Sequence, residues 1–293
     1  MNTHEILDRL SVGLGALTLG KNRFFCRRID SPPFCEHLEA IELEVPQIEM
    51  QGGYQAVAKT LAGRLDPGFY VARWLGEEHP TVIYHHGNNE RPFDFSHFSR
   101  NSFMHILLSE KEPVQANLIA LRAPFHRHLP TYIGKIPELN NFVAMLSVSV
   151  KLEEELISRL KEGHSRVMAA GMSLGGWVTN LHRAHFNTAD VYVPVLAGAS
   201  LGDMFLSSAY QRMTGRLARD HPREVRSILD FREEFERVAD DNVFPLLARH
   251  DQIVQMEVQS KCYGHCPLAI LEKGHLTGCS DYDSIRRHIL QHL

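Results

Sequence analysis

A glycine-rich segment in the middle of the chain places a serine at a sharp turn. Residues 171–176 read Gly-Met-Ser-Leu-Gly-Gly, which has the form G-x-S-x-G with one more glycine. A strand-like apolar run, 167–170, precedes the segment, and a helix-like run, 177–185, follows it. The small residues let the chain reverse without Cβ clashes, and the start of the next helix offers free N–H groups for a developing oxyanion. The pattern therefore predicts that Ser173 is a nucleophile.

A serine nucleophile needs a base and an acid that orients the base, and both follow further along the chain. The buried strand-like run 244–248 leads into a turn that holds Asp251. The run 267–271 leads into a Gly-His turn that holds His275. We therefore expect a catalytic triad of Ser173, Asp251 and His275, in the chain order that this arrangement favours.

These motifs together resemble those of the α/β-hydrolase superfamily, over roughly residues 66–293. The resemblance implies an α/β fold with a mostly parallel central sheet, helices on both faces, and the triad at the carboxyl ends of the strands. It also implies an oxyanion hole formed by the N–H groups of Leu174 and Asn88. Asn89 is the second choice for this role, because the sequence does not decide which amide points inward.

Two other acidic residues compete with Asp251 for the role of the acid. Asp203 follows the strand expected at 191–196, where some members of the superfamily carry the acid. Asp251 is preferred because an apolar pair follows it closely in its turn, as is usual for this acid. Glu272 is near His275 in sequence, but we expect it at the strand end, pointing elsewhere.

Apolar and polar runs alternate along the chain in the manner of a βαβ protein. Strands are expected at residues 41–45, 68–75, 81–84, 117–121, 167–170 and 191–196. Helices are expected at residues 95–108 and 138–161. The alternation predicts a mostly parallel sheet covered by helices on both faces, and the acidic alternation in 41–45 predicts a half-exposed edge strand.

The run His-His-Gly-Asn-Asn at 85–89 follows the strand expected at 81–84. We expect Gly87 to let this loop pass closely over the nucleophile, with His86, Gly87 and Asn89 beside the substrate. The alternative is a metal site at the two histidines. It is disfavoured because adjacent residues of a strand point to opposite faces, so the pair cannot easily share one ion.

The stretch 202–241 is longer than a typical crossover connection. Two helical patterns, 204–217 and 223–238, predict a short helical insert or a small cap over the site. Met204 is the residue of this insert that we expect to contact the substrate. Packing of the insert against the sheet, without such contact, is the alternative.

The first 20 residues predict a helix. Its apolar face comprises Ile6, Leu7, Leu10, Leu14 and Leu17. We expect this face to pack against the main domain; a role at a membrane surface or as a lid is the alternative. The chain then divides into an N-terminal helical extension, 1–37, packed on the core, and an α/β-hydrolase domain, 38–293.

Composition disfavours several classes of function. A formal net charge of −4 over 293 residues, without a long basic run, argues against a nucleic-acid partner. No apolar run is long enough to predict stable membrane insertion, and no secretory signal pattern opens the chain, so the cytoplasm is the expected location. Cys262 and Cys266 flank His265, but no second pair of metal ligands has matching spacing, so a loop is favoured over a zinc site.

The motifs lead to one expected function and three alternatives. We expect a serine-dependent hydrolase that cleaves a carboxylic ester or thioester of a small-molecule acyl substrate through an acyl-enzyme, with no cofactor and no metal. A peptidase or an acyltransferase with the same triad is one kind of alternative. A non-catalytic binding protein that keeps the fold is another. The sequence leaves the substrate and the oligomeric state open.

Overall fold

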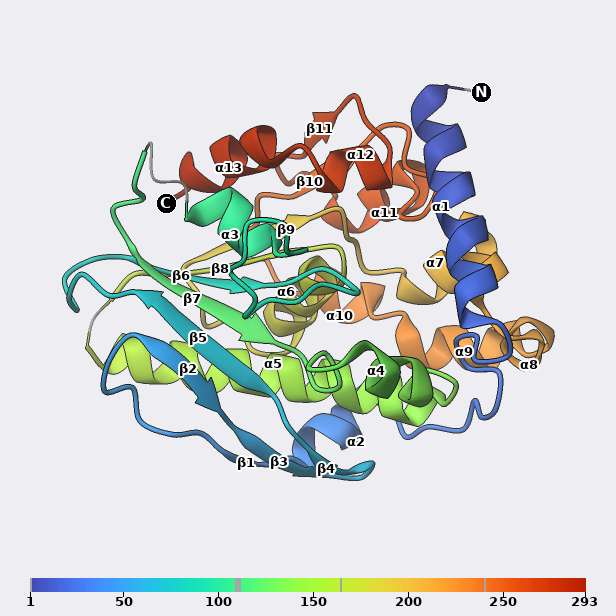
Figure 1. The fold of residues 1–293 in the computed structure, drawn as a ribbon, viewed down its shortest axis with the longest axis horizontal. Helices are drawn as coiled ribbons and strands as arrows, with labels where there is room; N and C mark the ends of the chain where they lie inside the picture. Colours follow the sequence, from blue (N-terminus) through green and yellow to red (C-terminus); the bar gives the residue numbers. More distant parts are fainter. Residues whose placement is uncertain (1, 109–111, 164, 240) are drawn as a thin grey trace.

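The computed structural model describes residues 2–108, 112–163, 165–239 and 241–293, so Asp240, inside the expected insert, lies outside the described residues. The main sheet (Figure 1) has the strand order β11 (Ala269–Leu271), β10 (Leu246–Ala248), β9 (Val191–Val195), β8 (Val167–Met172), β6 (Thr81–His85), β7 (Asn117–Arg122), β5 (Gly68–Arg73) and β2 (Gly52–Gln55). Neighbouring strands from β11 to β7 run parallel. Strands β5 and β2 extend the sheet in antiparallel pairing. The expectation of a mostly parallel sheet is confirmed.

A second, smaller sheet lies at one edge of the molecule. It has the order β1 (Glu42–Glu44), β3 (Val57–Thr60) and β4 (Gly63–Leu65), with antiparallel pairing. The strand expected at 41–45 is therefore an edge strand of this small sheet and not of the main one. The sequence analysis missed β2, β3 and β4, all of which are short. Strands β2 and β4 also contain glycines, which weaken a strand pattern.

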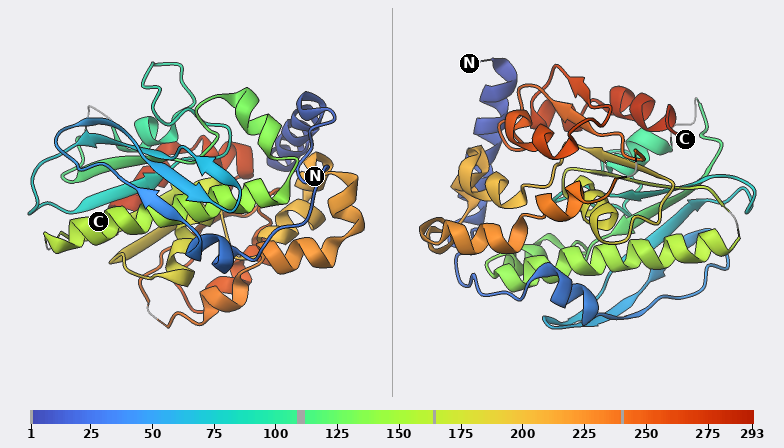
Figure 2. Two further views of the ribbon diagram at one scale, coloured as in Figure 1. Left: turned by 90° about the horizontal axis from the view of Figure 1, so that it is seen from below. Right: turned by 180° about the vertical axis from the view of Figure 1, so that it is seen from behind.

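Helices surround the main sheet. They are α1 (Thr3–Leu19), α2 (Phe34–Glu39), α3 (Ser102–Leu107), α4 (Leu129–Lys135), α5 (Leu139–Glu162), α6 (Leu174–His185), α7 (Leu201–Ser207), η1 (Ala209–Met213), α8 (Arg216–Asp220), α9 (Pro222–Leu229), α10 (Arg232–Glu236), α11 (Met256–Gln259), η2 (Ser260–Tyr263), α12 (His275–Cys279) and α13 (Tyr282–Leu290). Helices α3 and α13 cover one face of the sheet, and α5 and α6 cover the other (Figures 1 and 2). The side chains of β6 alternate between these layers: Val82 and Tyr84 pack toward α3 and α13, and Ile83 packs toward α5 and α6.

The helix expected at 95–108 is much shorter in the structure. It starts only at Ser102, because the side chain of Asn101 accepts a hydrogen bond from the Met104 N–H and caps it there. The preceding residues form turns, which leaves a loop between β6 and α3 free to line the site described below.

The insert at 202–241 does not contain two continuous helices. The first expected helix is divided into α7, η1 and the start of α8, because Ser208 adopts an extended conformation and caps η1. Helix α9 begins at Pro222, a residue that suits the first turn of a helix and interrupts a preceding one. The result is a set of short helices beside the carboxyl edge of the sheet (Figure 1).

Helix α1 is rotated by about half a turn from the expected orientation. Its buried side chains are Asp8, Val12, Ala16 and Leu19. The apolar side chains that were expected to pack inward are exposed: Ile6, Leu7, Leu10, Leu14 and Leu17. The expectation for this face is therefore wrong. Small residues explain the close approach of the other face, since a Cβ added at Gly15 would lie 3.0 Å from the Met213 sulfur of η1.

The cysteines at 262 and 266 lie in η2 and in the turn that follows it. The Cys262 thiol donates to the Gln259 carbonyl at 3.1 Å. Within the described part of the chain, no group of three or more His, Cys, Asp or Glu side chains is arranged to hold a metal ion. Among the described helices, none has both the length and the apolar character needed to cross a membrane.

Candidate active site

Ser173 lies at a tight turn between β8 and α6. Its backbone φ of 52° is in the left-handed region, which is rare for a residue with a side chain and typical of strained functional sites. Glycines on both sides make the turn possible. A Cβ at Gly171 would lie 2.4 Å from the Gly175 carbonyl carbon, and a Cβ at Gly175 would lie 2.0 Å from the His85 oxygen. The helix therefore starts directly against the end of β6.

Three side chains from separate strand ends meet at this turn. Ser173 Oγ lies 3.0 Å from His275 Nε2. His275 Nδ1 lies 2.7 Å from Asp251 Oδ2, which accepts its hydrogen bond. Asp251 is itself fixed, because its other oxygen accepts from the N–H groups of Ile253 and Val254, each at 2.7 Å. The geometry is that of a nucleophile, a base and an orienting acid.

The electrostatic environment of His275 favours its charged form. Burial by itself lowers the pKa of the imidazole, but the adjacent Asp251 carboxylate, together with Cys279, more than offsets this effect. The pKa of His275 is therefore held well above 6.5. A histidine with this partner can accept a proton from Ser173 and retain it at low cost.

The two rival acids are engaged elsewhere. Asp203 Oδ1 lies 2.9 Å from Nε of Arg226, within the insert. Glu272 Oε1 lies 2.6 Å from Nε of Arg249, on the surface. Neither carboxylate is bonded to His275.

Asp8 of helix α1 holds both loops that carry the base and the acid. Its buried carboxylate accepts hydrogen bonds from the N–H groups of Gln252 (3.0 Å), His275 (2.8 Å) and Leu276 (2.9 Å). The sequence analysis missed this residue. Helical spacing places Asp8 on one face with Val12, Ala16 and Leu19, and this pattern could have indicated a buried acid. It was overlooked because an acidic residue in a helix is normally expected on the exposed face.

The loop between β6 and α3 covers the turn at Ser173, and Glu90 fixes it. Glu90 Oε1 accepts from the Gly87 N–H at 2.9 Å, and Oε2 accepts from Ser102 N–H and Oγ at 2.8 and 2.7 Å. The side chain of Asn88 donates to the Tyr210 hydroxyl of η1 at 3.2 Å. Within the residues that the structure describes, the N–H groups of Asn88 and Leu174 have no protein acceptor.

A cavity of about 490 Å³ opens at Ser173 and His275. The loop contributes Gly87, Asn88, Asn89 and Glu90 to its lining, and Leu174 lies beside the serine. Its apolar wall contains Phe24, Phe142, Trp177, Leu201, Met204, Phe205, Ile253 and Leu276. Of the residues expected beside the substrate, Gly87, Asn89 and Met204 therefore line the cavity.

His86 does not line this cavity, which corrects the expectation that it contacts the substrate. The residue is buried, with Nδ1 2.7 Å from the Gly87 carbonyl oxygen. Its Nε2 accepts a hydrogen bond from the Ala123 N–H at 3.1 Å. Both ring nitrogens are thus bonded to backbone groups, and burial lowers the pKa of His86 well below 6.5. The His86 side chain therefore joins the loop after β6 to the segment that follows β7.

Comparison with known proteins gives similarity at the level of structure. No family model matches the sequence, and no curated protein matches it in a sequence search. Acetyl xylan esterase 1 from Thermoanaerobacterium sp. JW/SL YS485 is 14% identical over 94% of this chain and 98% of that chain, with a TM-score of 0.57. An α/β-hydrolase enzyme from a Medee basin deep-sea metagenome library is 12% identical over 78% and 94%, with a TM-score of 0.50.

A peptidase shares part of its structure with this chain. The acylaminoacyl peptidase of Pyrococcus horikoshii is 15% identical over 86% of this chain but only 40% of its own chain, with a TM-score of 0.52. At such low identities, these similarities show the fold alone.

Proposed function

Because the chain has the α/β-hydrolase fold and brings Ser173, His275 and Asp251 into one hydrogen-bonded series, we propose that it is a serine-dependent hydrolase. The bond cleaved is a carboxylic ester or thioester, and the reaction proceeds through an acyl-enzyme. The observation that carries the proposal is the 3.0 Å distance from Ser173 Oγ to His275 Nε2 at the opening of a cavity.

The three side chains have separate roles in this mechanism. His275 Nε2 takes the proton of Ser173 while Oγ attacks the acyl carbon. Asp251 accepts from Nδ1–H, which keeps the Nε2 lone pair toward the serine and stabilises the imidazolium. His275 then gives the proton to the leaving alkoxide or thiolate. A water molecule, activated by the same base, releases the acid from Ser173.

The developing oxyanion needs hydrogen-bond donors beside Ser173. We assign the N–H groups of Leu174 and Asn88 to this role, with Asn89 as the second choice. Support comes from their positions at the cavity and from the lack of a protein acceptor for the Leu174 and Asn88 amides among the described residues. Leu174 also opens α6, whose positive dipole end suits a negative charge.

The cavity wall favours an apolar acyl group. Met204 and Phe205 from the insert, with Phe24 and Phe142, form an apolar region beside the serine. A solved esterase and a solved peptidase share the fold with this chain, so the fold alone does not separate ester cleavage from peptide cleavage. A peptidase, an acyltransferase or a non-catalytic binding protein are the outcomes that the experiments must separate.

Labelling with a fluorophosphonate probe tests the proposal. The wild-type protein should be labelled covalently, and Ser173→Ala should lose labelling while its circular dichroism and melting temperature stay near those of the wild type. Loss of the nucleophile should reduce ester turnover by several orders of magnitude. Full turnover by Ser173→Ala would refute the assignment of the nucleophile, and an unlabelled wild-type protein would favour a binding role.

A panel of p-nitrophenyl and thiophenyl esters, from acetyl to dodecanoyl, then identifies the acyl group. The apolar wall predicts that kcat/KM rises from acetyl toward longer chains. Met204→Glu should lower turnover of the longer esters more than turnover of the acetyl ester, because the charged group would enter the apolar region. Equal effects on all chain lengths would contradict the placement of the acyl group against Met204.

A further inference from the structure

Helix α1 exposes an apolar stripe that no described residue covers. Leu10, Leu14 and Leu17 are 59%, 66% and 78% exposed, and Ile6 and Leu7 continue the stripe toward the N-terminus. The spacing of these residues places them on one face of the helix. Apolar side chains that are exposed singly are ordinary, but a contiguous stripe of this kind marks a binding surface.

The stripe borders the opening of the cavity at Ser173. Ser11, on the flank of the same helix, lines that cavity together with Leu276, which is itself 42% exposed. Leu276 N–H is bonded to Asp8 of α1, so this leucine lies directly beside the helix. Helix α1 therefore carries the stripe on its outer face and contributes to the lining of the site from its flank.

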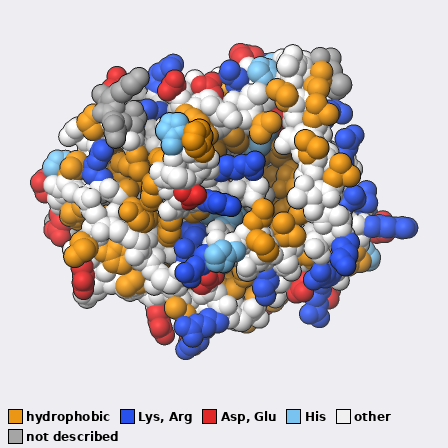
Figure 3. Space-filling model, in the orientation of Figure 1, with side chains coloured by type: hydrophobic (Ala, Val, Ile, Leu, Met, Phe, Trp, Pro, Cys, Tyr) orange, Lys and Arg blue, Asp and Glu red, His pale blue; other side chains and the backbone are white. Residues whose placement is uncertain are grey.

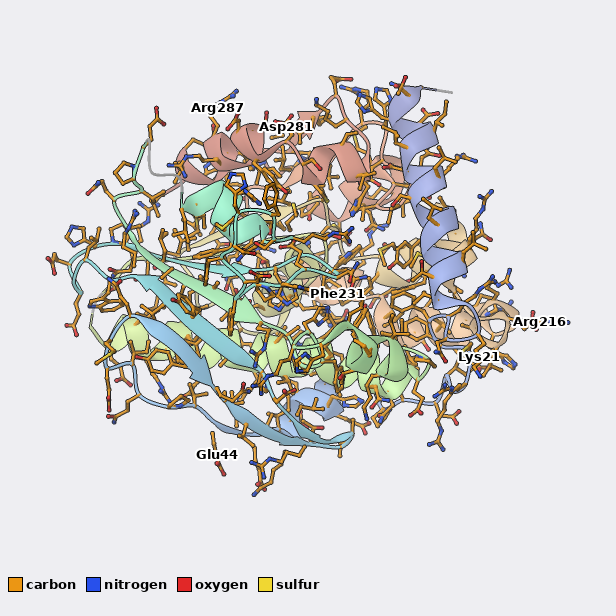
Figure 4. All side chains as sticks on the ribbon, in the orientation of Figure 1. Lys21, Glu44, Arg216, Phe231, Asp281 and Arg287 are labelled. Carbon is orange, nitrogen blue, oxygen red and sulfur yellow. The ribbon has the colours of Figure 1, made fainter. Side chains whose placement is uncertain are left out.

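Basic side chains gather at the C-terminal end of the stripe. Lys21 follows α1, and Phe24 exchanges backbone hydrogen bonds with Met213 and Gly215, which brings η1 and α8 to this end. The exposed cations there are Lys21, Arg212, Arg216 and Arg219. One acid of this region, Asp220, pairs with Arg216 at 3.3 Å. Figure 3 shows hydrophobic side chains over α1 with Lys and Arg side chains below them, and Figure 4 places Lys21 and Arg216 at the same end of the molecule.

We propose that this face of α1 docks on a lipid surface with anionic headgroups, so that an acyl ester passes from the lipid to Ser173. The choice of substrate rests on the proposed function; the docking itself does not. Leucines on one face and cations beside them are the combination that binds a helix parallel to an anionic lipid interface. A second copy of the chain is the other occupant that a leucine stripe could have. If two α1 helices paired in parallel, however, their basic clusters would lie next to each other and repel.

Vesicle binding tests the docking without turnover. All proteins carry Ser173→Ala and are sedimented with vesicles of phosphatidylcholine alone or of phosphatidylcholine and phosphatidylglycerol in equal parts. Binding to the anionic vesicles should weaken with salt, and Leu14→Gln with Leu17→Gln should weaken it by about tenfold or more. Leu61→Gln, at an exposed leucine on the turn between β3 and β4, is the matched control and should bind like the parent.

A second pair of variants isolates the electrostatic part. Arg212→Gln with Arg219→Gln should reduce binding to the anionic vesicles and its salt dependence. Absence of binding to either vesicle, or equal binding by the leucine variants, would overturn the proposal. A dimer in analytical ultracentrifugation that the leucine variants dissociate, without vesicle binding, would assign the stripe to a second copy instead. Failure of the proposed hydrolase function would be seen separately, as absence of fluorophosphonate labelling.

A different observation carries a second inference, which rests on the proposed function. The Asp8 carboxylate accepts from the N–H groups of Gln252, His275 and Leu276, and thus joins the acid loop to the base loop. The neighbouring contacts support this junction, since His4 Nδ1 lies 2.9 Å from Thr277 Oγ1. We infer that Asp8 is a positioning residue that keeps His275 in line between Asp251 and Ser173.

The test compares Asp8→Ala and Asp8→Asn with Arg9→Gln. Arg9 is the matched control, because it is a neighbour of Asp8 whose described hydrogen bonds go to the Gln252 side chain, at 2.8 and 3.2 Å. We expect kcat per fluorophosphonate-titrated site to fall by about tenfold to a hundredfold in Asp8→Ala, with KM changed little, since small misplacements of a base are costly. Asp8→Asn should lie between Asp8→Ala and the wild type, because the amide keeps one acceptor oxygen.

Two readouts separate positioning from simple loss of structure. A purely structural role would lower the number of titrated sites and the melting temperature but leave kcat per site unchanged within about twofold, which would overturn the inference. The downfield NMR resonance of the His275 Nδ1 proton requires no turnover. It should shift or broaden in Asp8→Ala and stay in place in Arg9→Gln, and an unchanged resonance in Asp8→Ala would also overturn it.

Discussion

At the scale of single residues, His275 is held from three directions. Asp251 bonds its Nδ1, Ser173 lies at its Nε2, and Asp8 accepts from its backbone N–H. The ring orientation therefore depends on contacts from the strand ends and from the N-terminal helix. We therefore expect a substitution at position 8 to affect chemistry at position 275.

The first prediction concerns the pH dependence of kcat/KM. His275 must be neutral to act as the base, and its pKa is raised by the Asp251 charge, so kcat/KM should increase as pH rises through a pKa above 6.5. Asp251→Asn removes the negative charge, so the acid limb of the profile should move to lower pH. Turnover itself should fall by about 10⁴, because the tautomer is no longer held. An acid limb that does not move in Asp251→Asn would show that another group sets it.

At the scale of single elements, the loop after β6 is fixed by a carboxylate. The Glu90 side chain bonds Gly87 N–H on one side and Ser102 on the other, at the start of α3. The backbone φ of Gly87 is not in the left-handed region. Glycine is required because there is no room for a side chain: a Cβ at this position would lie 2.5 Å from Glu90 Oε1. Any side chain at this position therefore displaces the group that holds the loop.

The second prediction follows from this contact. Gly87→Val should move Glu90 and shift the Asn88 amide away from the oxyanion, which lowers kcat by about a hundredfold. The free energy of unfolding, measured with urea, should change much less, because the carboxylate is the flexible end of a side chain. Normal turnover of esters by Gly87→Val would contradict the assignment of Asn88 as a donor and leave the triad untouched.

The third prediction concerns the contact between α6 and β6. Gly175→Ala places a Cβ 2.0 Å from the His85 carbonyl oxygen, and backbone cannot yield there as a side chain can. We expect the free energy of unfolding to fall by about 3 kcal/mol, as for severe overpacking. Gly134→Ala is the control: it is exposed in α4, nothing lies within 4 Å of an added Cβ, and alanine should stabilise that helix by about 0.5–1 kcal/mol. Equal stabilities of the two variants would contradict the tight turn.

At the scale of the whole molecule, one buried acid opposes the stability of the fold. Glu153 of α5 is fully buried, and neither of its carboxyl oxygens has a hydrogen-bond partner among the described residues. Burial, with the nearby charge of Glu154, raises the pKa of Glu153 to about 8. A carboxyl group in such surroundings is kept protonated near neutral pH.

The fourth prediction is a pH dependence of stability that Glu153 causes. The unfolded chain releases the proton near 4.5 and the folded chain near 8, so the folded state binds more protons between these values. The contribution of Glu153 to the free energy of unfolding should therefore decrease as pH rises from about 4.5 to about 8, by on the order of 4 kcal/mol. Urea unfolding of Glu153→Gln should lack this decrease. Parallel pH profiles for the variant and the wild type would rule out the raised pKa.

Local sequence patterns were enough to predict the class of fold. The parallel sheet, the long helix near 138–161 and the turn at 171–176 follow from apolar periodicity and glycines, which act between near neighbours. The same turns singled out Ser173, Asp251 and His275, whose side chains meet in the structure at 3.0 and 2.7 Å, although their catalytic roles stay predictions.

Tertiary structure alone decided which face of α1 meets the protein. Periodicity identifies an apolar stripe, and such a stripe is normally expected to point inward. Here the opposite face is buried, because the Asp8 carboxylate bonds backbone groups that are 244 to 268 positions away along the chain. It also decided that His86 supports the loop and that Glu90 fixes it, since both depend on partners supplied by other elements. Hydrogen bonds between distant segments leave no periodic trace in a sequence, so these features become visible only when the chain is folded.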